Sequence, residues 1–250
     1  MPMPPGKLPA SLVNLLATNV NTAEARTKQA LAKEVQRLLP QFQAKGRLLF
    51  LTPVDYLLRG VLLDASDISK NLFYPTAFVQ PLYGGSDYIF FTFGGRLRDS
   101  RNRTKWDIGD EEWSVMAGQL AAAIKEQALT LFEHISTPLD LALACDSSEA
   151  FAPHFHWVCD DIHVMETAAQ SWLLAGNTRK SLECSQKIQH VIASSSDRRD
   201  WVLALNGRAQ RLEELLSSEK EDFVRRELNI AAKHSAETLG LSRWAAIPEF

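Results

Sequence analysis

Cysteine, long apolar runs and strong net charge are all scarce in this 250-residue sequence. Its three cysteines, Cys145, Cys159 and Cys184, are too few and too scattered for a disulfide framework, so we expect reduced thiols and a cytoplasmic protein. No apolar stretch approaches the roughly 18 residues of a membrane span, and residues 1–20 lack the features of a signal peptide. We therefore expect no association with a membrane.

The common catalytic motifs are also missing. The sequence contains no G-x-S-x-G, H-E-x-x-H or P-loop pattern, and we expect no cofactor. A net charge of −3 excludes a globally basic nucleic-acid binder, although not a local basic patch. With 46% hydrophobic and 23% charged residues, the composition is that of an ordinary globular protein.

The stretch 72–97 is the most informative part of the chain. Two apolar, aromatic-rich runs flank Gly84-Gly85-Ser86-Asp87, a pattern that predicts a β-hairpin with a short turn. Pro75 implies an edge position or a bulge for the strand that contains it. Together with an earlier apolar run, these segments predict an antiparallel sheet with strands at 56–64, 72–83 and 88–93.

The rest of the chain has helical periodicity. An apolar stripe from Leu31 to Phe42 predicts a helix that Lys45-Gly46 would end. Later stripes predict a helix from about residue 110 to 135, a short helix capped by Thr137-Pro138, a helical hairpin broken at Gly176-Asn177, and two further helices.

These elements predict an α+β protein with a small antiparallel sheet flanked by helices, followed by an all-helical C-terminal domain. We expect an extended N-terminal arm over 1–20, the sheet domain over 21–145, and the helical domain with its αα-hairpin over 146–250.

One cluster has the residue types of a metal site. His154, His156, Cys159 and His163 lie within ten residues, and zinc prefers such nitrogen and sulfur ligands. The same stretch also suits a junction before a helix, because Asp160-Asp161 are natural N-cap residues. We favour the structural interpretation and expect no metal. The alternative is a metal-dependent or Cys/His-dependent hydrolase built on this cluster.

A second cluster is basic. Five cations fall within ten positions after the predicted hairpin, next to aromatic residues. They could form a solvated connector, contact an acidic protein surface, or contact phosphates. Because the chain is acidic overall, we expect a protein partner rather than nucleic acid. The predicted partner-binding residues are Gln80, Tyr83, Arg96, Arg98, Arg101, Arg103, Lys105 and Trp106.

Three motifs resemble a family of uncharacterised bacterial proteins. They are a strand of the form f-x-Q-P-L-y, a strand of the form f-x-f-G-x-R-L, and a turn of the form I-x-T-P-x-D-L. The matching residues are Phe78, Gln80, Pro81, Leu82, Tyr83, Phe91, Phe93, Gly94, Arg96, Leu97, Ile135, Thr137, Pro138, Asp140 and Leu141. Proteins of this shape loosely resemble immunity or accessory proteins of bacterial toxin systems. The resemblance implies a non-catalytic cytoplasmic protein-binding module that neutralises a toxin.

Overall fold

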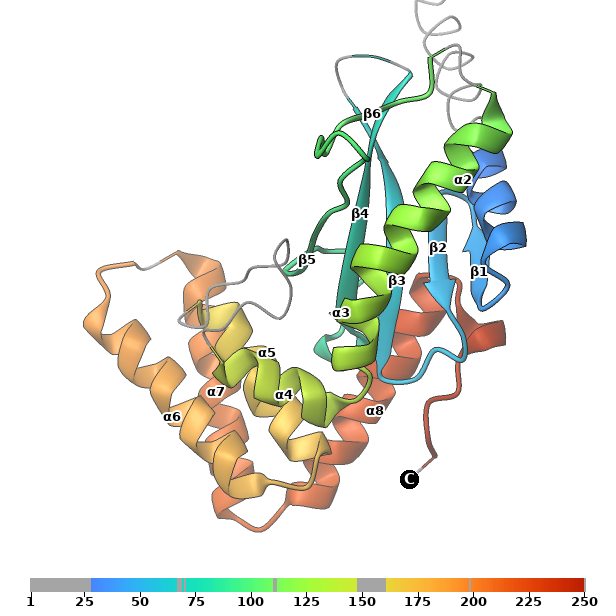
Figure 1. Ribbon diagram of the computed structural model, residues 1–250. Helices are drawn as coiled ribbons and strands as arrows, with labels where there is room; N and C mark the ends of the chain where they lie inside the picture. The colour runs from blue at the N-terminus through green and yellow to red at the C-terminus, as the bar shows by residue number, and fades with distance from the viewer. Residues whose placement is uncertain are drawn as a thin grey trace, which may run out of the picture.

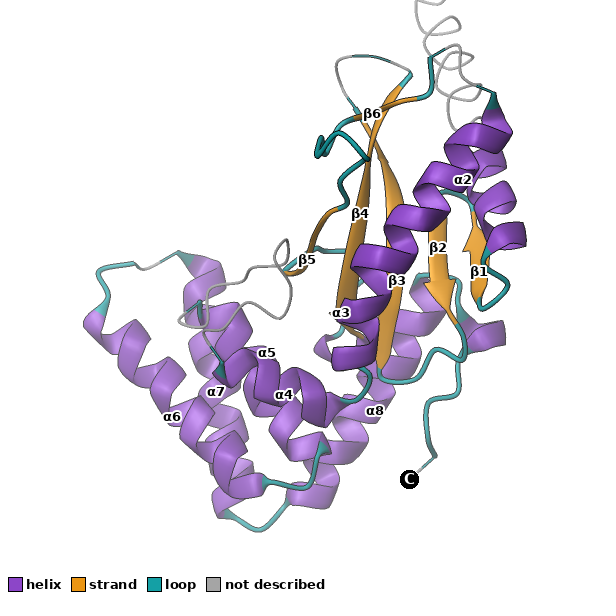
Figure 2. Cartoon of the chain, in the orientation of Figure 1, coloured by secondary structure: helices purple, strands orange, loops and turns teal. Residues whose placement is uncertain are grey.

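The computed structural model describes residues 28–66, 69, 71–109, 112–147, 161–197 and 199–249. An open antiparallel sheet with helices packed on it continues into a helical array formed by the later part of the chain (Figure 1). Strands and helices are thus segregated along the chain (Figure 2), as expected for an α+β protein. The predicted N-terminal arm, residues 1–20, lies outside the described residues.

All pairings between the strands β1 to β6 are antiparallel, and one isolated parallel bridge joins Val54 to Ala245. The order is β1-β2-β3-β4-β5, and β6 pairs with β4 beside β5. The longest pairing joins β3 to β4, from Leu57 opposite Pro81 to Ala65 opposite Phe73, and it confirms the first two predicted strands. The strands are β1 (Phe42–Lys45), β2 (Leu48–Leu51), β3 (Leu57–Ala65), β4 (Leu72–Pro81), β5 (Phe93–Arg96) and β6 (Trp106–Asp107).

Strands β1 and β2 were not predicted. Residues 28–38 are helical, and Pro40 ends the helix because proline disfavours the helical conformation of the residue before it. Gly46, with φ of 60°, therefore makes the turn of the β1–β2 hairpin and does not stop a helix. The apolar run of β2 becomes a strand because it pairs with β3, with Leu49 opposite Val61.

The predicted strand 88–93 is wrong except at its last residue. The chain leaves β4 in a 3-10 turn, η1 (Leu82–Gly84), and stays irregular until β5 begins at Phe93. The buried side chain of Gln80 takes the place of a neighbouring strand here. Its Nε2 donates to the Tyr88 carbonyl at 3.0 Å, and its Oε1 accepts from the Phe90 amide at 3.3 Å. These bonds satisfy the backbone without extending the sheet.

Pro75 sits in a central strand but costs it no hydrogen bond. Its partner across the β3–β4 pair, Leu63, donates its amide to the Arg47 carbonyl on the other side of β3. The nitrogen of Pro75 therefore faces away from β3, between the part of β4 that pairs with β5 and the part that pairs with β6. The missing N–H falls where β4 has a gap in its partners.

The predicted helices that follow the sheet are confirmed. Thr137 and Asp140 form a capping box at the start of α4, in which the Thr137 hydroxyl accepts from the Asp140 amide at 3.2 Å. No helix within the described ranges is long and apolar enough to cross a membrane. The helical elements are α2 (Trp113–Ala123), the π-helical turn η2 (Ile124–Ala128), α3 (Leu129–His134), α4 (Pro138–Asp146), α5 (Ile162–Leu174), α6 (Thr178–Ser194), α7 (Asp200–Ser217), α8 (Glu221–Thr238) and the 3-10 turn η3 (Ser242–Trp244).

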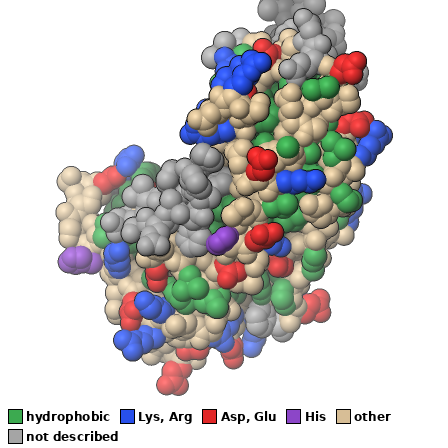
Figure 3. Space-filling model, in the orientation of Figure 1, with side chains coloured by type: hydrophobic (Ala, Val, Ile, Leu, Met, Phe, Trp, Pro, Cys, Tyr) green, Lys and Arg blue, Asp and Glu red, His purple; other side chains and the backbone are tan. Residues whose placement is uncertain are grey.

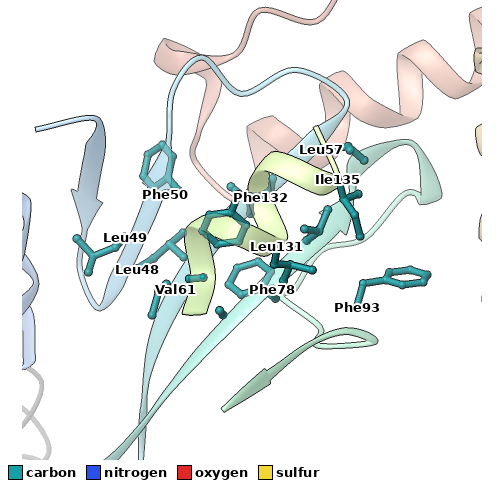
Figure 4. Packing of buried hydrophobic residues seen from close by; sticks show 14 of the residues in the cluster. Leu48, Leu49, Phe50, Leu57, Val61, Phe78, Phe93, Leu131, Phe132 and Ile135 are labelled. Carbon is teal, nitrogen blue, oxygen red and sulfur yellow. The ribbon is translucent and has the colours of Figure 1, made fainter. Parts of the chain in front are cut away.

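The core is built mainly between the sheet and its helices. Phe132 of α3 packs toward the strands that carry Val61 and Phe78 (Figure 4). Buried residues of the helical array, among them Trp172 and Leu228, belong to the same hydrophobic cluster. A second, smaller cluster lies between α5, α6 and α7. The sheet and the array therefore share one core, and part of the array has a core of its own.

Candidate partner-binding loop

The connection between β5 and β6 is held at its base. We refer to residues 96–105 as the basic loop. The side chain of Gln127 makes two hydrogen bonds to the backbone of Arg98, accepting from its amide at 2.9 Å and donating to its carbonyl at 2.8 Å. At the other end, the indole of Trp106 donates to the Leu97 carbonyl at 3.1 Å. Gln127 lies in the π-helical turn η2, a local distortion often found at functional sites.

The tip of the basic loop is ordered by one carboxylate. Oδ1 of Asp99 accepts from the amides of Arg101 at 2.9 Å and Arg103 at 2.8 Å, and Oδ2 accepts from the Arg103 guanidinium. Asn102 takes the left-handed conformation, with φ of 63°, which closes the turn. Partial burial raises the pKa of Asp99, but the bonds from Arg103 and Arg101 outweigh it and hold that pKa below its ordinary value.

Three of the five cations already have partners inside the loop or beside it. The Arg96 guanidinium lies 4.0 Å above the ring of Tyr74, and Arg103 forms an ion pair with Asp99 at 2.7 Å. Arg98 donates to the side-chain oxygen of Asn102 at 3.1 Å.

The other two cations, Arg101 and Lys105, differ from these three. The side chains of Arg101 and Lys105 are exposed and have no ionic partner among the residues described. Lys and Arg side chains gather on the surface over this connection (Figure 3). The basic loop is thus an ordered platform that presents two unpaired charges beside three that are internally held.

The remaining predicted partner-binding residues are buried. Gln80 is fully enclosed and Trp106 is 2% exposed, so both support the loops around them and do not face solvent. The Tyr83 hydroxyl donates to the Ser171 hydroxyl at 2.5 Å, since that serine donates its own proton to the Thr167 carbonyl. Burial raises the pKa of the Tyr83 phenol, which therefore stays protonated. These three side chains are therefore buried parts of the fold, and of the predicted residues the cations of the basic loop are the more accessible ones.

The predicted metal cluster is only partly visible. His154, His156 and Cys159 lie outside the described residues. His163 is exposed at the start of α5, and its ring stacks on Trp201 with 5.0 Å between centroids. Within the described ranges, no three His, Cys, Asp or Glu side chains come together in a way that could hold a metal ion.

Two residues that organise the basic loop were missed in the sequence. Asp99 had a local signal, because an aspartate followed by Ser100, Arg101 and Asn102 is typical of a turn in which the carboxylate binds its own backbone. Gln127 had none, since it contacts a segment 29 residues away and resembles any polar residue on a helix.

Comparison of the chain with known protein families, with curated proteins and with solved structures found no match.

Proposed function

We propose that this protein is a non-catalytic protein-binding module whose basic loop docks on an acidic surface of a partner protein. The observation that carries this proposal is the order of the loop. Gln127 fixes its base and Asp99 fixes its tip, whereas a mere connector between two short strands needs neither contact.

Such order lowers the cost of binding. A flexible loop loses conformational entropy when it docks, while a loop already held in one conformation has lost that entropy during folding. The exposed guanidinium of Arg101 can pair with two oxygens of one carboxylate, and Lys105 adds a compact point charge. Arginine is also among the residues that most often dominate binding energy at protein interfaces.

The internal pairing of the loop favours a protein partner over nucleic acid. Affinity for nucleic acid grows with the number of phosphates that are neutralised, and a groove usually contacts many of them. Asp99 neutralises Arg103, while Tyr74 holds Arg96 and Asn102 binds Arg98. Arg101 and Lys105 are then the two cations of the loop that have no partner among the described residues. Two charges suit the steering and anchoring of a carboxylate-rich protein surface.

The resemblance of the three motifs supplies the kind of partner in this proposal. Under it, the acidic surface belongs to a bacterial toxin, and the module neutralises the toxin by covering that surface. This role requires no chemistry from the module itself.

The test is charge reversal at the two unpaired cations. The variant Arg101→Glu/Lys105→Glu leaves Asp99 and its bonds in place. A matched control, Lys33→Glu/Arg226→Glu, reverses two exposed cations on helices elsewhere. Tagged wild-type protein is used to capture partners from the native host, and the association rate of the purified partner is then measured for all three proteins at two salt concentrations.

We expect the loop variant to associate at least about tenfold more slowly and to lose most of the salt dependence, while the control resembles the wild type. Equal association rates for the wild type and the loop variant would refute the role of the loop. Tight binding of wild-type protein to random-sequence DNA or RNA that is lost in the loop variant would refute the proposal of a protein partner. It would indicate that the basic loop binds nucleic acid instead.

A further inference from the structure

The helical array contains a cavity that the function proposed above does not use. A space of about 220 Å³ lies between α5, α6, α7 and α8. Three helices contribute small side chains to its wall, Ala169, Ser185 and Ala209, and these leave the space open. Ala209, on α7, belongs to the smaller hydrophobic cluster, and Val224, on α8, belongs to the main one. Residues of both hydrophobic clusters therefore line the cavity.

The mouth of this cavity carries unused hydrogen-bond donors. Nε and Nη2 of Arg208 bind the two carboxylate oxygens of Glu166, at 2.6 and 3.0 Å, which leaves Nη1 unused. Arg211, one turn further along α7, has no ionic partner within the described ranges. The side-chain amide of Gln170 lines the same space and makes no hydrogen bond to another described residue.

We propose that this cavity binds a small amphipathic anion, with an aromatic ring or a medium-length aliphatic chain inside and a carboxylate at the mouth. A dry apolar cavity of about 150 Å³ is known to accept benzene, so the larger space here accommodates a ring with a short substituent or a chain of similar volume. Filling it would join the two hydrophobic clusters across Ala209 and Val224.

The charges around the mouth place the carboxylate of the ligand. Arg211 and Gln170 offer donors on the α5–α7 side, and Arg208 adds its Nη1, so a carboxylate can accept several hydrogen bonds there. The Glu166 carboxylate on this side is paired with Nε and Nη2 of Arg208, which offsets its charge. Glu227 lies on the α8 side and repels an anion placed there. The half-exposed ring of Phe223, 45% accessible, gives the apolar part of the ligand a wall at the entrance. This site lies apart from the basic loop and does not depend on its role.

The test uses octanoate as the probe and 1-octanol as its neutral counterpart. Both are titrated into isotope-labelled full-length protein, and amide shifts in NMR spectra report the affinity and the location. Two pairs of variants separate the contributions. Arg211→Gln removes a donor at the mouth and Arg226→Gln is its exposed control on α8. Ala209→Trp fills the cavity, and Ala204→Trp makes the same change on the exposed face of α7.

We expect octanoate to shift amides around the cavity and to bind at least about tenfold more tightly than octanol. Arg211→Gln should lower the affinity for octanoate by about tenfold and leave the affinity for octanol unchanged, because it removes a charge-assisted hydrogen bond that only the anion makes. Ala209→Trp should abolish the binding of octanoate and of octanol. The control variants Arg226→Gln and Ala204→Trp should bind both probes as the wild type does. Equal affinities for acid and alcohol, shifts elsewhere on the protein, or full affinity in Arg211→Gln would overturn the proposal. The comparison of Arg211→Gln with Arg226→Gln tests the proposal even if Ala209→Trp does not fold.

Discussion

Replacement of Gly94 by alanine should damage the sheet where it supports the basic loop. Gly94 lies opposite Phe78 in the β4–β5 pair. A Cβ at this position would come within 2.3 Å of the Ala77 carbonyl oxygen and 2.9 Å of the Phe78 Cα. Both contacts are with backbone, so no flexible side chain can move aside. Overpacking typically costs about 1–3 kcal/mol, and loosening β5 would also expose the buried ring of Phe93, so we expect a loss of at least about 3 kcal/mol.

The matched control is Gly207→Ala. Gly207 lies on the exposed face of α7, and a Cβ there meets no atom within 4 Å. The control should therefore gain about 0.5–1 kcal/mol, because alanine restricts the unfolded chain and favours the helix. Urea unfolding followed by circular dichroism gives both free energies. A free energy of unfolding for Gly94→Ala within about 0.5 kcal/mol of the wild type, which is roughly the scatter of neutral surface changes, would contradict the close approach of the two strands. An equal loss of stability in Gly207→Ala would contradict it as well.

Three further predictions concern side chains in different settings. Trp172→Ala should cost about 3–5 kcal/mol because its ring is buried, whereas Phe91→Ala, only partly buried against Phe78, should cost about 1–2 kcal/mol; the same urea unfolding measures both, and equal costs would contradict the burial argument. Protection of the loop amides that bind Asp99 should be complete above the ordinary carboxyl pKa of about 3.9 and should disappear as pH falls through the lowered pKa of this group, because the folded loop favours the charged form. Hydrogen-exchange protection factors measure this, and factors that are unchanged once Asp99 is protonated would show that the carboxylate does not hold the tip. Burial raises the pKa of the Cys184 thiol to about 11, so a disulfide reagent at pH 8 should label it at least about tenfold more slowly than free cysteine, as mass spectrometry of the labelled peptide would show.

Much of the fold could be predicted because its signals are local. The helical hairpin broken at Gly176-Asn177 needs only a 3.6-residue apolar period and a residue that caps the second helix, and Asn177 does accept from the Lys180 amide at 3.1 Å. The cap at Thr137 is equally local, since its partner Asp140 lies three residues away. Strands β3 and β4 could be predicted because long apolar runs with β-branched and aromatic residues favour strands.

The complete sheet could not be predicted from the sequence in the same way. The apolar run of β2 is too short to distinguish a strand from a helix end, and its state depends on β3, with which it pairs. The fate of residues 88–92 depends on Gln80, whose side chain satisfies their backbone in place of a strand. In both cases a contact with another segment outweighs the local preference.

The candidate site shows the same division. The amino-acid sequence by itself determines that five cations lie within ten residues and that Asp99 begins a turn. Only the tertiary structure decides which of those cations are unpaired, because Arg96 is held by Tyr74 on a neighbouring strand and the base of the loop by Gln127, 29 residues from Arg98. Charge is a property of each residue, whereas pairing, burial and order are properties of the contacts that folding creates between distant parts of the chain.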